Sequence, residues 1–262
     1  MRAVVLGGSG FIGAATVRRL RERGCGVATF HRAEDASIRG DRADLAAHRD
    51  AFAHFAPDVV LDTIAYAEKD GAALVAVFRG IAGRSVVLSS QDVYASYGRL
   101  MRLESGPPDS KPSGEDAPLR NSRFPYRAMA GGPEDMAHDY EKILVERAVA
   151  ADPALPATVL RLPCVYGAGD RHHRVGRVLA RMRPGEPVLI DRSKAGWRWT
   201  RGSVENVADA IALAILDGRA TGRAYNVGET SPLSEAEWTR EIGRAAGWDG
   251  EVRAVAKEDL PA

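Results

Sequence analysis

The stretch VVLGGSGFIGAA, residues 4–15, joins a short apolar run to a helix-like pattern through a glycine-rich turn. Gly8, Gly10 and Gly13 form a G-x-G-x-x-G arrangement, and Gly7 begins an overlapping G-x-x-G-x-x-G. Glycines permit a tight turn and let the backbone approach a pyrophosphate, which the N–H groups of the following helix attract. Because the motif follows a strand and opens a helix, it predicts a dinucleotide-binding βαβ unit.

The alternation of apolar runs and helical patterns continues through the first half of the chain. Strands that are apolar throughout and separated by helices imply a parallel sheet covered on both faces. Right-handed crossovers then give a doubly wound α/β fold. The pattern predicts strands at 3–6, 26–30, 58–65, 85–90 and 157–162, and helices at 11–24, 45–55, 69–83 and 134–151.

The rest of the chain is less regular. Segment 91–133 is rich in proline and glycine and has little periodicity, which is typical of a functional loop. Beyond about residue 165 the elements are shorter, and Ser234 with Glu237 forms a capping box before the last helix. We expect a dinucleotide-binding domain over 1–165 and a smaller substrate lobe over 166–262, partly interleaved with the main sheet. The later elements predicted are strands at 187–190 and 224–228 and helices at 204–218 and 234–247.

The bulk composition narrows the class of protein. The net charge is +1, from 36 basic and 35 acidic residues, so no excess of positive charge indicates a nucleic-acid partner. Cys25 and Cys164 lie far apart, which predicts no disulfide framework and fits a reducing cytoplasm. The first apolar run is short and broken by glycine, so we expect neither a signal peptide nor a membrane span. His172 and His173 have no carboxylate at a supporting spacing, and we expect no metal site.

The end of the second predicted strand bears on the choice of dinucleotide. An acidic residue at this place binds the adenosine ribose, whereas a cation accommodates a 2′-phosphate. Here His31 and Arg32 occupy the place, and Glu34 and Asp35 come slightly late. The sequence therefore favours NADP over NAD, unless Arg32 is an ordinary surface residue.

Further segments follow the glycine loop in the order of a known family. They are GDRADL (40–45), VVLDTIAY (59–66), VVLSSQDVYASYG (86–98), KILVE (142–146), RLPCVYGAGD (161–170) and AYNVGE (224–229). Over nearly its whole length the chain resembles the extended short-chain dehydrogenases/reductases of the NAD-dependent epimerase/dehydratase family. The resemblance implies a Rossmann-type sheet and an NAD(P)-dependent enzyme that transfers a hydride.

The resemblance also assigns roles to residues. Ser90 matches the catalytic serine, which hydrogen-bonds the substrate oxygen. Lys142 matches the lysine that holds the nicotinamide ribose and lowers the pKa of a catalytic tyrosine. The cofactor-binding positions implied are Gly7, Gly10, Phe11, Ile12 and Gly13 in the loop, Asp41 and Arg42 beside adenine, and Ala65 after the strand that passes the cofactor.

The chain departs from the family at the catalytic tyrosine. In the family this tyrosine precedes the lysine by four residues, and four residues turn a helix by about 400°, so both side chains share one face. Position 138 holds His138 instead. Tyr140 is only about 200° from Lys142 on a regular helix and would point nearly the opposite way.

Three side chains are candidates for the missing proton donor. His138 has the inherited position, and imidazole carries protons near neutral pH. Tyr140 is suitable only if the backbone before Lys142 is not helical. Tyr126 lies in the long loop and could approach from outside. The remaining alternative is that nothing replaces the tyrosine, as in non-redox NAD(P)-binding members with a regulatory or RNA-binding role.

The substrate is less well specified by the sequence. The resemblance implies a small carbonyl or sugar-like molecule, and nucleotide sugars are the family's commonest substrates. Arg127 and Arg201 are suited to clamping a phosphate or carboxylate. Apolar faces on 71–83 and 141–150 match the helices through which family members often form homodimers. The candidate residues lining the pocket are Tyr94, Arg127, Tyr166, Trp197, Trp199 and Arg201.

Overall fold

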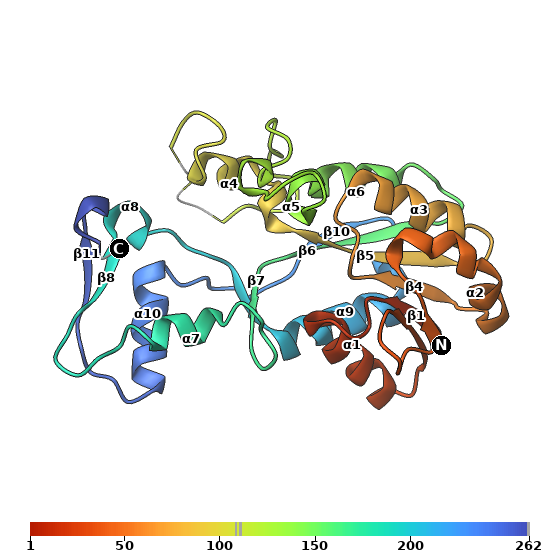
Figure 1. Ribbon diagram of the computed structural model, residues 1–262, viewed down its shortest axis with the longest axis horizontal. Helices are drawn as coiled ribbons and strands as arrows, with labels where there is room; N and C mark the ends of the chain where they lie inside the picture. Colours follow the sequence, from red (N-terminus) through yellow and green to blue (C-terminus); the bar gives the residue numbers. More distant parts are fainter. Residues whose placement is uncertain (108, 110–111, 261–262) are drawn as a thin grey trace. The chain divides into compact units, whose positions relative to one another are not determined.

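The computed structural model describes residues 1–107, 109 and 112–260, which form two compact units (Figure 1). The first comprises Met1–Asp109, Ser113–Leu162 and Glu205–Val227, and the second is built mainly from Pro163–Val204 and the chain after Val227. Residues 108, 110 and 111 of the predicted long loop, and 261 and 262 of the predicted lobe, lie outside the described residues.

A seven-stranded parallel sheet forms the centre of the first unit, which confirms the predicted Rossmann-type α/β fold. Its order is β10-β6-β5-β4-β1-β2-β3, so the chain runs outward from β1 in one direction and then in the other. β1, β4, β5 and β6 are almost wholly buried because helices cover both faces. The strands are β1 (Arg2–Leu6), β2 (Gly26–His31), β3 (Ile38–Arg39), β4 (Val59–Asp62), β5 (Arg84–Ser90), β6 (Ala157–Leu162) and β10 (Ala224–Asn226).

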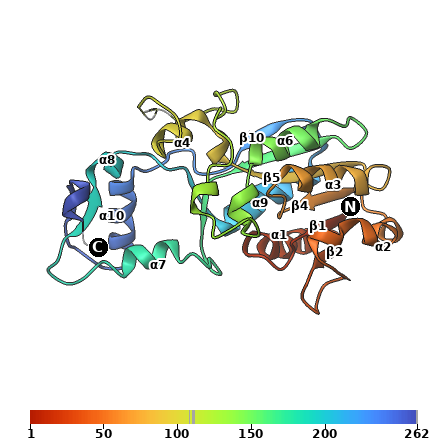
Figure 2. The same cartoon turned by 45° about the horizontal axis from the view of Figure 1, so that its top comes forward.

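Helices α1 (Phe11–Glu22) and α9 (Val204–Leu216) cover one face of this sheet, and α2 (Arg49–Phe55), α3 (Glu68–Phe78) and α6 (Lys142–Ala150) cover the other (Figures 1 and 2). The core on the α2–α3–α6 side includes Phe30, Phe52 and Phe78. Gly71 lets α3 approach α6 closely, because a Cβ there would lie 3.0 Å from the Cβ of Ala148. The short helices η1 (Arg42–His48) and η4 (Gly218–Ala220) complete this layer arrangement.

Two sequence predictions for the first unit need correction. The helix predicted over 134–151 is broken into α5 (Met136–Asp139) and α6, with Tyr140 and Glu141 extended between them. The segment predicted as a loop over 91–133 contains three short helices. They are η2 (Gln91–Val93), α4 (Ala95–Leu100) and η3 (Arg127–Met129).

The second unit consists of short elements. Two pairs of parallel strands are present, β7 (Cys164–Tyr166) with β9 (Arg201–Ser203), and β8 (Val188–Asp191) with β11 (Val252–Val255). Val188, Ile190 and Val252 form its small core, against which Met182 and Trp248 pack. The predicted capping box of Ser234 and Glu237 is confirmed. The helices are α7 (Arg174–Leu179), α8 (Arg192–Ala195), α10 (Glu235–Ala245) and η5 (Lys257–Asp259).

The two units divide between Leu162 and Pro163, near the boundary expected at residue 165. Residues 205–227 belong to the first unit, since β10 pairs with β6 and α9 packs on the first unit's sheet. Among the described residues, no helix combines the length and apolar character needed to cross a membrane.

Candidate active site

The carboxyl ends of three neighbouring strands define the candidate site. β5, β4 and β1 lie next to one another in the sheet and end at Ser90, Asp62 and Leu6. In open parallel sheets the crevice at this edge, where the strand order reverses, is the usual ligand site. The first unit thus presents two polar strand ends, Asp62 and Ser90, where a cofactor is expected.

The loop between β1 and α1 fits the pyrophosphate of a dinucleotide. Gly7 adopts a φ of 82°, and a Cβ at Gly13 would lie 2.2 Å from the carbonyl oxygen of Gly7. Both positions therefore require glycine. The first turn of α1 has no acidic residue, and its N-cap, Gly10, provides no side-chain hydrogen bond. The positive end of α1 is consequently free to attract an anion.

The residues expected around the adenosine end have differing environments. His31 is buried, and its Nδ1 has no hydrogen-bond partner among the described residues. Arg32 is exposed, with its guanidinium 3.7 Å from a carboxylate oxygen of Asp41. Arg42, in contrast, pairs internally with buried Asp62, so its side chain is already in use. The predicted contact of Arg42 with adenine stays a prediction.

The break between α5 and α6 brings Tyr140 to the same side of the chain as Lys142. Tyr140 (φ −61°, ψ 116°) and Glu141 (φ −157°, ψ 93°) are extended, and α6 begins at Lys142. Alternate side chains of an extended segment point the same way. Two residues apart, Tyr140 and Lys142 can therefore share one side of the chain, as residues four apart do on a helix. The ammonium nitrogen of Lys142 lies 5.7 Å from the centroid of the Tyr140 ring.

A buried ion pair holds this break in place. The fully buried Glu141 accepts hydrogen bonds from Arg120 at 3.2 and 3.3 Å, from the backbone N–H of Phe124 at 2.8 Å, and from that of Ile143 at 3.0 Å. The last of these bonds caps α6. The N–H of Glu141 donates to the carbonyl of Tyr66 rather than to an α5 carbonyl. Glu141 therefore begins a new helix. We call the Arg120–Glu141 ion pair and its backbone hydrogen bonds the clamp, and this clamp stops α5 from continuing.

Lys142 is held in a fixed position at the sheet edge. Its Nζ donates to the carbonyls of Ala65 at 2.5 Å and Leu88 at 2.9 Å, and only 4% of the residue is exposed. Burial lowers the pKa of Lys142 to about 8, against the opposing effect of nearby carboxylates, above all Asp92. The predicted cofactor-binding position Ala65 thus contacts the lysine through its carbonyl.

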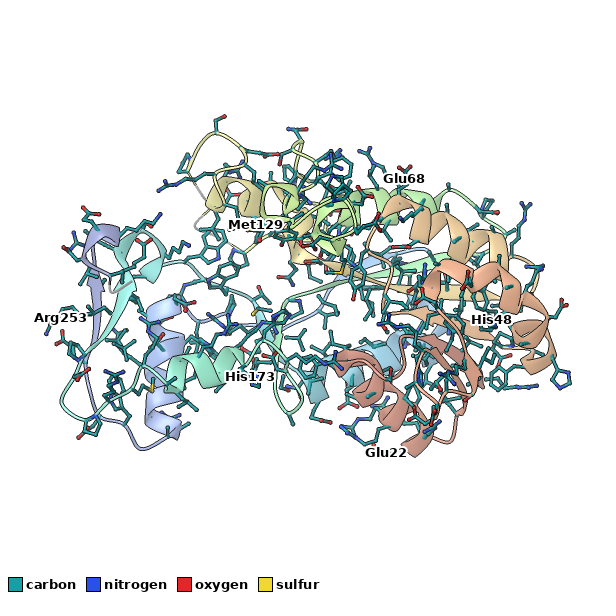
Figure 3. All side chains as sticks on the ribbon, viewed as in Figure 1. Glu22, His48, Glu68, Met129, His173 and Arg253 are labelled. Carbon is teal, nitrogen blue, oxygen red and sulfur yellow. The ribbon has the colours of Figure 1, made fainter. Side chains whose placement is uncertain are left out.

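A cluster of tyrosines surrounds a buried carboxyl group beside Lys142. The hydroxyls of Tyr140 and Tyr126 donate to the same oxygen of Asp92, at 2.9 and 3.0 Å. Ser90 ends β5, and its Oγ accepts the backbone N–H of Asp92 at 3.2 Å. Burial and then the Asp92 charge raise the pKa of Tyr140, and hydrogen bonding with Ser90 opposes the rise. Met129, labelled in Figure 3, ends the short helix that follows Tyr126.

The three candidates for the proton donor are now distinguished by position. Tyr140 contacts Asp92 and faces Lys142, and Tyr126 contacts Asp92 and the Tyr140 ring. His138 lies on α5 and hydrogen-bonds Asp139 at 2.8 Å. Its described contacts include neither Ser90 nor Lys142. The inherited position is therefore separated from the lysine by the break, and the structure brings Ser90, Tyr140, Tyr126 and Lys142 together without it.

Two predicted substrate residues of the first unit are already engaged internally. Tyr94 is buried, and its hydroxyl donates to Asn226 at 2.7 Å and accepts from Arg161 at 2.9 Å. The role of Tyr94 in lining a substrate pocket stays a prediction. The Arg127 guanidinium stacks 3.7 Å from the Phe124 ring centroid and pairs with Asp139.

Three of the four other predicted substrate residues, Tyr166, Trp199 and Arg201, line a pocket of about 450 Å³ in the second unit. Trp197 is not among the residues that line it. The lining of this pocket includes several cationic and aromatic side chains. Arg201 is buried there, with its charge compensated by Glu235 at 2.6 Å. Arg177 and Lys194 are exposed and make no ion pair within the described part of the chain. The aromatic lining consists of Tyr166, Trp199 and Trp238. His173, labelled in Figure 3, immediately precedes α7 of this unit.

Several residues that shape the site were not anticipated from the sequence. Asp92 lies in the SSQDVY segment two residues after Ser90, so its place just beyond a strand end was the available signal. No sequence pattern marked Arg120 and Glu141, because their pairing depends on how the long segment folds. The described residues contain no group of histidine, cysteine or acidic side chains arranged to hold a metal ion.

The fold and the glycine loop together define a Rossmann-type dinucleotide-binding protein. The chain belongs to the NAD-dependent epimerase/dehydratase family, whose model matches residues 3–228. The resemblance inferred from the sequence motifs is therefore confirmed. A comparison with curated protein sequences gave no significant match.

Solved structures of similar proteins support the same fold. The UDP-glucose 4-epimerase of Thermus thermophilus, in complex with NAD, is 24% identical with a TM-score of 0.67, over 98% of this chain and 86% of that one. The UDP-N-acetylglucosamine 4-epimerase of Bacillus cereus is 16% identical with a TM-score of 0.71, over 100% and 88%. A short-chain dehydrogenase/reductase superfamily protein of Agrobacterium tumefaciens, with bound NAD, is 19% identical with a TM-score of 0.71, over 98% and 85%. At these identities the similarity establishes the fold.

The clamp leads to a first prediction. Glu141→Gln removes the carboxylate that is hydrogen-bonded to the buried Arg120 guanidinium and leaves Asp92, at 3.9 Å, as the nearest counter-charge. Breaking a buried pair costs ~3–5 kcal/mol of unfolding free energy. Asp139→Asn is the matched control two residues away, because Asp139 is exposed and its pairs contribute little. Urea unfolding measures both. Equal, small losses would contradict the clamp.

Proposed function

We propose that this protein is a nicotinamide-dinucleotide-dependent oxidoreductase or epimerase in which Tyr140 transfers the proton and Lys142 and Ser90 assist. The observation that carries the proposal is the extended Tyr140–Glu141 segment, which aligns Tyr140 with Lys142. The pair restores the tyrosine and lysine that hydride chemistry on a carbonyl requires, although the sequence spacing is different.

The residues of the site have distinct tasks. When bound, the nicotinamide ring accepts or supplies the hydride at the substrate carbon. Tyr140 gives a proton to the substrate oxygen or removes one, which a positioned acid–base group must do. Lys142 lowers the energy of the deprotonated phenol through its positive charge, and Ser90 hydrogen-bonds the substrate oxygen. Because the pKa of Lys142 is about 8, this charge weakens above that pH.

We propose nucleotide sugars as the substrate class. In the second unit, Arg177 and Lys194 offer positive charge suited to a diphosphate. Trp199 and Trp238 offer aromatic surfaces for a base or sugar in the same pocket. One similar protein has been solved in complex with NAD and either UDP-glucose or UDP-glucuronic acid, which supports the same chemistry.

We also propose that the dinucleotide is NADP. The end of β2 carries His31 and Arg32 in place of the carboxylate that binds an unmodified ribose. The buried Nδ1 of His31 makes no hydrogen bond within the described residues and lies 4.0 Å from a carboxylate oxygen of Asp35. NAD is the alternative, since the similar structures named above contain it.

The identity of the proton donor is tested with a matched pair of variants. Tyr140→Phe removes the transferable proton and lowers kcat about 10²–10⁴-fold. His138→Gln, two residues earlier, leaves kcat unchanged. Turnover is followed with NAD(P)⁺ or NAD(P)H on UDP-glucose, UDP-glucuronic acid, UDP-N-acetylglucosamine and simple aldehydes and ketones, with product analysis for epimerisation.

Two results would contradict this assignment. A loss of turnover in His138→Gln, with Tyr140→Phe unaffected, would give the role to the histidine. Tight dinucleotide binding by the wild-type protein without turnover of any substrate in the panel would instead favour the non-redox alternative.

The cofactor preference is tested at Arg32. If this guanidinium contacts the 2′-phosphate, Arg32→Ala weakens NADPH binding about tenfold, which corresponds to ~1.4 kcal/mol, and leaves NADH binding unchanged. Arg21→Ala, an exposed arginine near the far end of α1, is the control. Fluorescence titration gives both dissociation constants. Equal weakening of the two dinucleotides would refute the preference.

A further inference from the structure

The carboxyl group of Asp92 is buried and accepts a hydrogen bond from the hydroxyl of Tyr140. The residue is 5% exposed, and its Oδ2 accepts hydrogen bonds from Tyr140 and Tyr126. Its Oδ1 has no hydrogen-bond partner among the described residues. Burying a carboxyl group with an unpaired oxygen costs free energy, so the arrangement calls for an explanation other than stability.

Asp92 also lacks a full counter-charge. The closest guanidinium nitrogen, of Arg120, is 3.9 Å from Oδ1, and that guanidinium is already hydrogen-bonded to Glu141. Burial raises the pKa of Asp92, opposed by Arg120 and the hydrogen bonds from the phenols. Burial and the Asp92 charge also raise the pKa of Tyr140. Two acids therefore compete for protons along one hydrogen bond. The titratable or charged groups around them include Arg120, Glu141, Lys142, Tyr66, Tyr97 and Tyr126.

We propose that Asp92 exchanges a proton with Tyr140 while Tyr140 exchanges one with the substrate, a role that rests on the function proposed above. During alcohol oxidation, the substrate O–H bond breaks as an O–H bond forms on Tyr140. The original Tyr140 O–H bond breaks at the same time, and its proton goes to Oδ2 of Asp92. The electron pair of the substrate C–H bond leaves as the hydride accepted by the nicotinamide dinucleotide. Carbonyl reduction reverses each transfer.

The exchange avoids an unfavourable charge arrangement. If Tyr140 ionised alone, its phenolate would lie within hydrogen-bond distance of the Asp92 carboxylate, and two like charges at that distance repel strongly. With the proton exchange, the pair carries one negative charge before the substrate proton is taken up and none afterwards, and never two. Tyr126 continues the chain, because its hydroxyl lies 2.9 Å from that of the half-buried Tyr97. A proton on Asp92 thus has a hydrogen-bonded path away from the substrate.

The coupling between the two groups is measured without any substrate. Tyrosine ionisation is followed by ultraviolet absorbance in wild type and Asp92→Asn, and the Tyr140 component is the difference from the matching Tyr140→Phe proteins. Removing the neighbouring negative charge lowers the pH of Tyr140 ionisation by about one unit or more. No shift would overturn the proposal, whether or not the protein is an enzyme.

Kinetics tests the transfer itself, on whichever substrate of the panel the wild type converts. Asp92→Asn lowers kcat about 100-fold. The KM and the dinucleotide affinity stay the same, and the pH profile of kcat changes. Asp139→Asn, an exposed carboxylate outside the cluster, changes none of these. A kcat within about threefold of wild type, or an unchanged pH profile, would overturn the proposal. An inactive wild type would instead count against the proposed function, and the titration would still decide the coupling.

A reciprocal measurement covers the case in which Asp92→Asn does not fold. In Tyr140→Phe the Asp92 carboxylate loses one of its two donors, so Asp92 ionises at a higher pH than in wild type. Infrared difference spectra of the carboxyl band against pH report this shift. A carboxyl titration unchanged by Tyr140→Phe would overturn the proposal.

Discussion

The buried ion pair between Arg120 and Glu141 is the constraint on which the candidate site depends. It fixes the backbone just before α6 and gives Glu141 partners that a continuous helix would not offer. A continuous helix would present His138 one turn before Lys142, whereas the break presents Tyr140. The buried charges of Arg120, in the long segment, and Glu141, at the cap of α6, thus determine which side chain can act with Lys142.

The sheet edge joins this segment to the cofactor loop. Lys142 donates to Ala65, which follows β4, and to Leu88 within β5, while the glycine loop follows the neighbouring strand β1. Parallel strands bring all three ends to one edge, so the groups for binding a dinucleotide and for moving a proton share a single rigid frame. The family assignment and the geometry of this edge therefore lead to the same class of chemistry.

The sequence predicted the features that depend on local patterns. The apolar strands and amphipathic helices predicted the doubly wound sheet. The spacing of the glycines, where the backbone must approach a pyrophosphate closely, predicted the cofactor loop. The break at Tyr140 was not predicted, because the segment before Lys142 contains no proline or glycine after Pro133. Its cause is tertiary: the partners of Glu141 lie 17 and 21 residues earlier in the chain. The internal hydrogen bonds and ion pair of Tyr94 and Arg42 were not foreseen for a similar reason, since their partners become neighbours only in the folded structure.

A crystal structure of the protein with bound dinucleotide tests the central claim most directly. The account predicts an extended Tyr140–Glu141 segment, with the Tyr140 hydroxyl on the side of Lys142 and beside the nicotinamide ring. A continuous helix from Met136 to Ala150, with the His138 imidazole facing Lys142 and Tyr140 turned away, would contradict it.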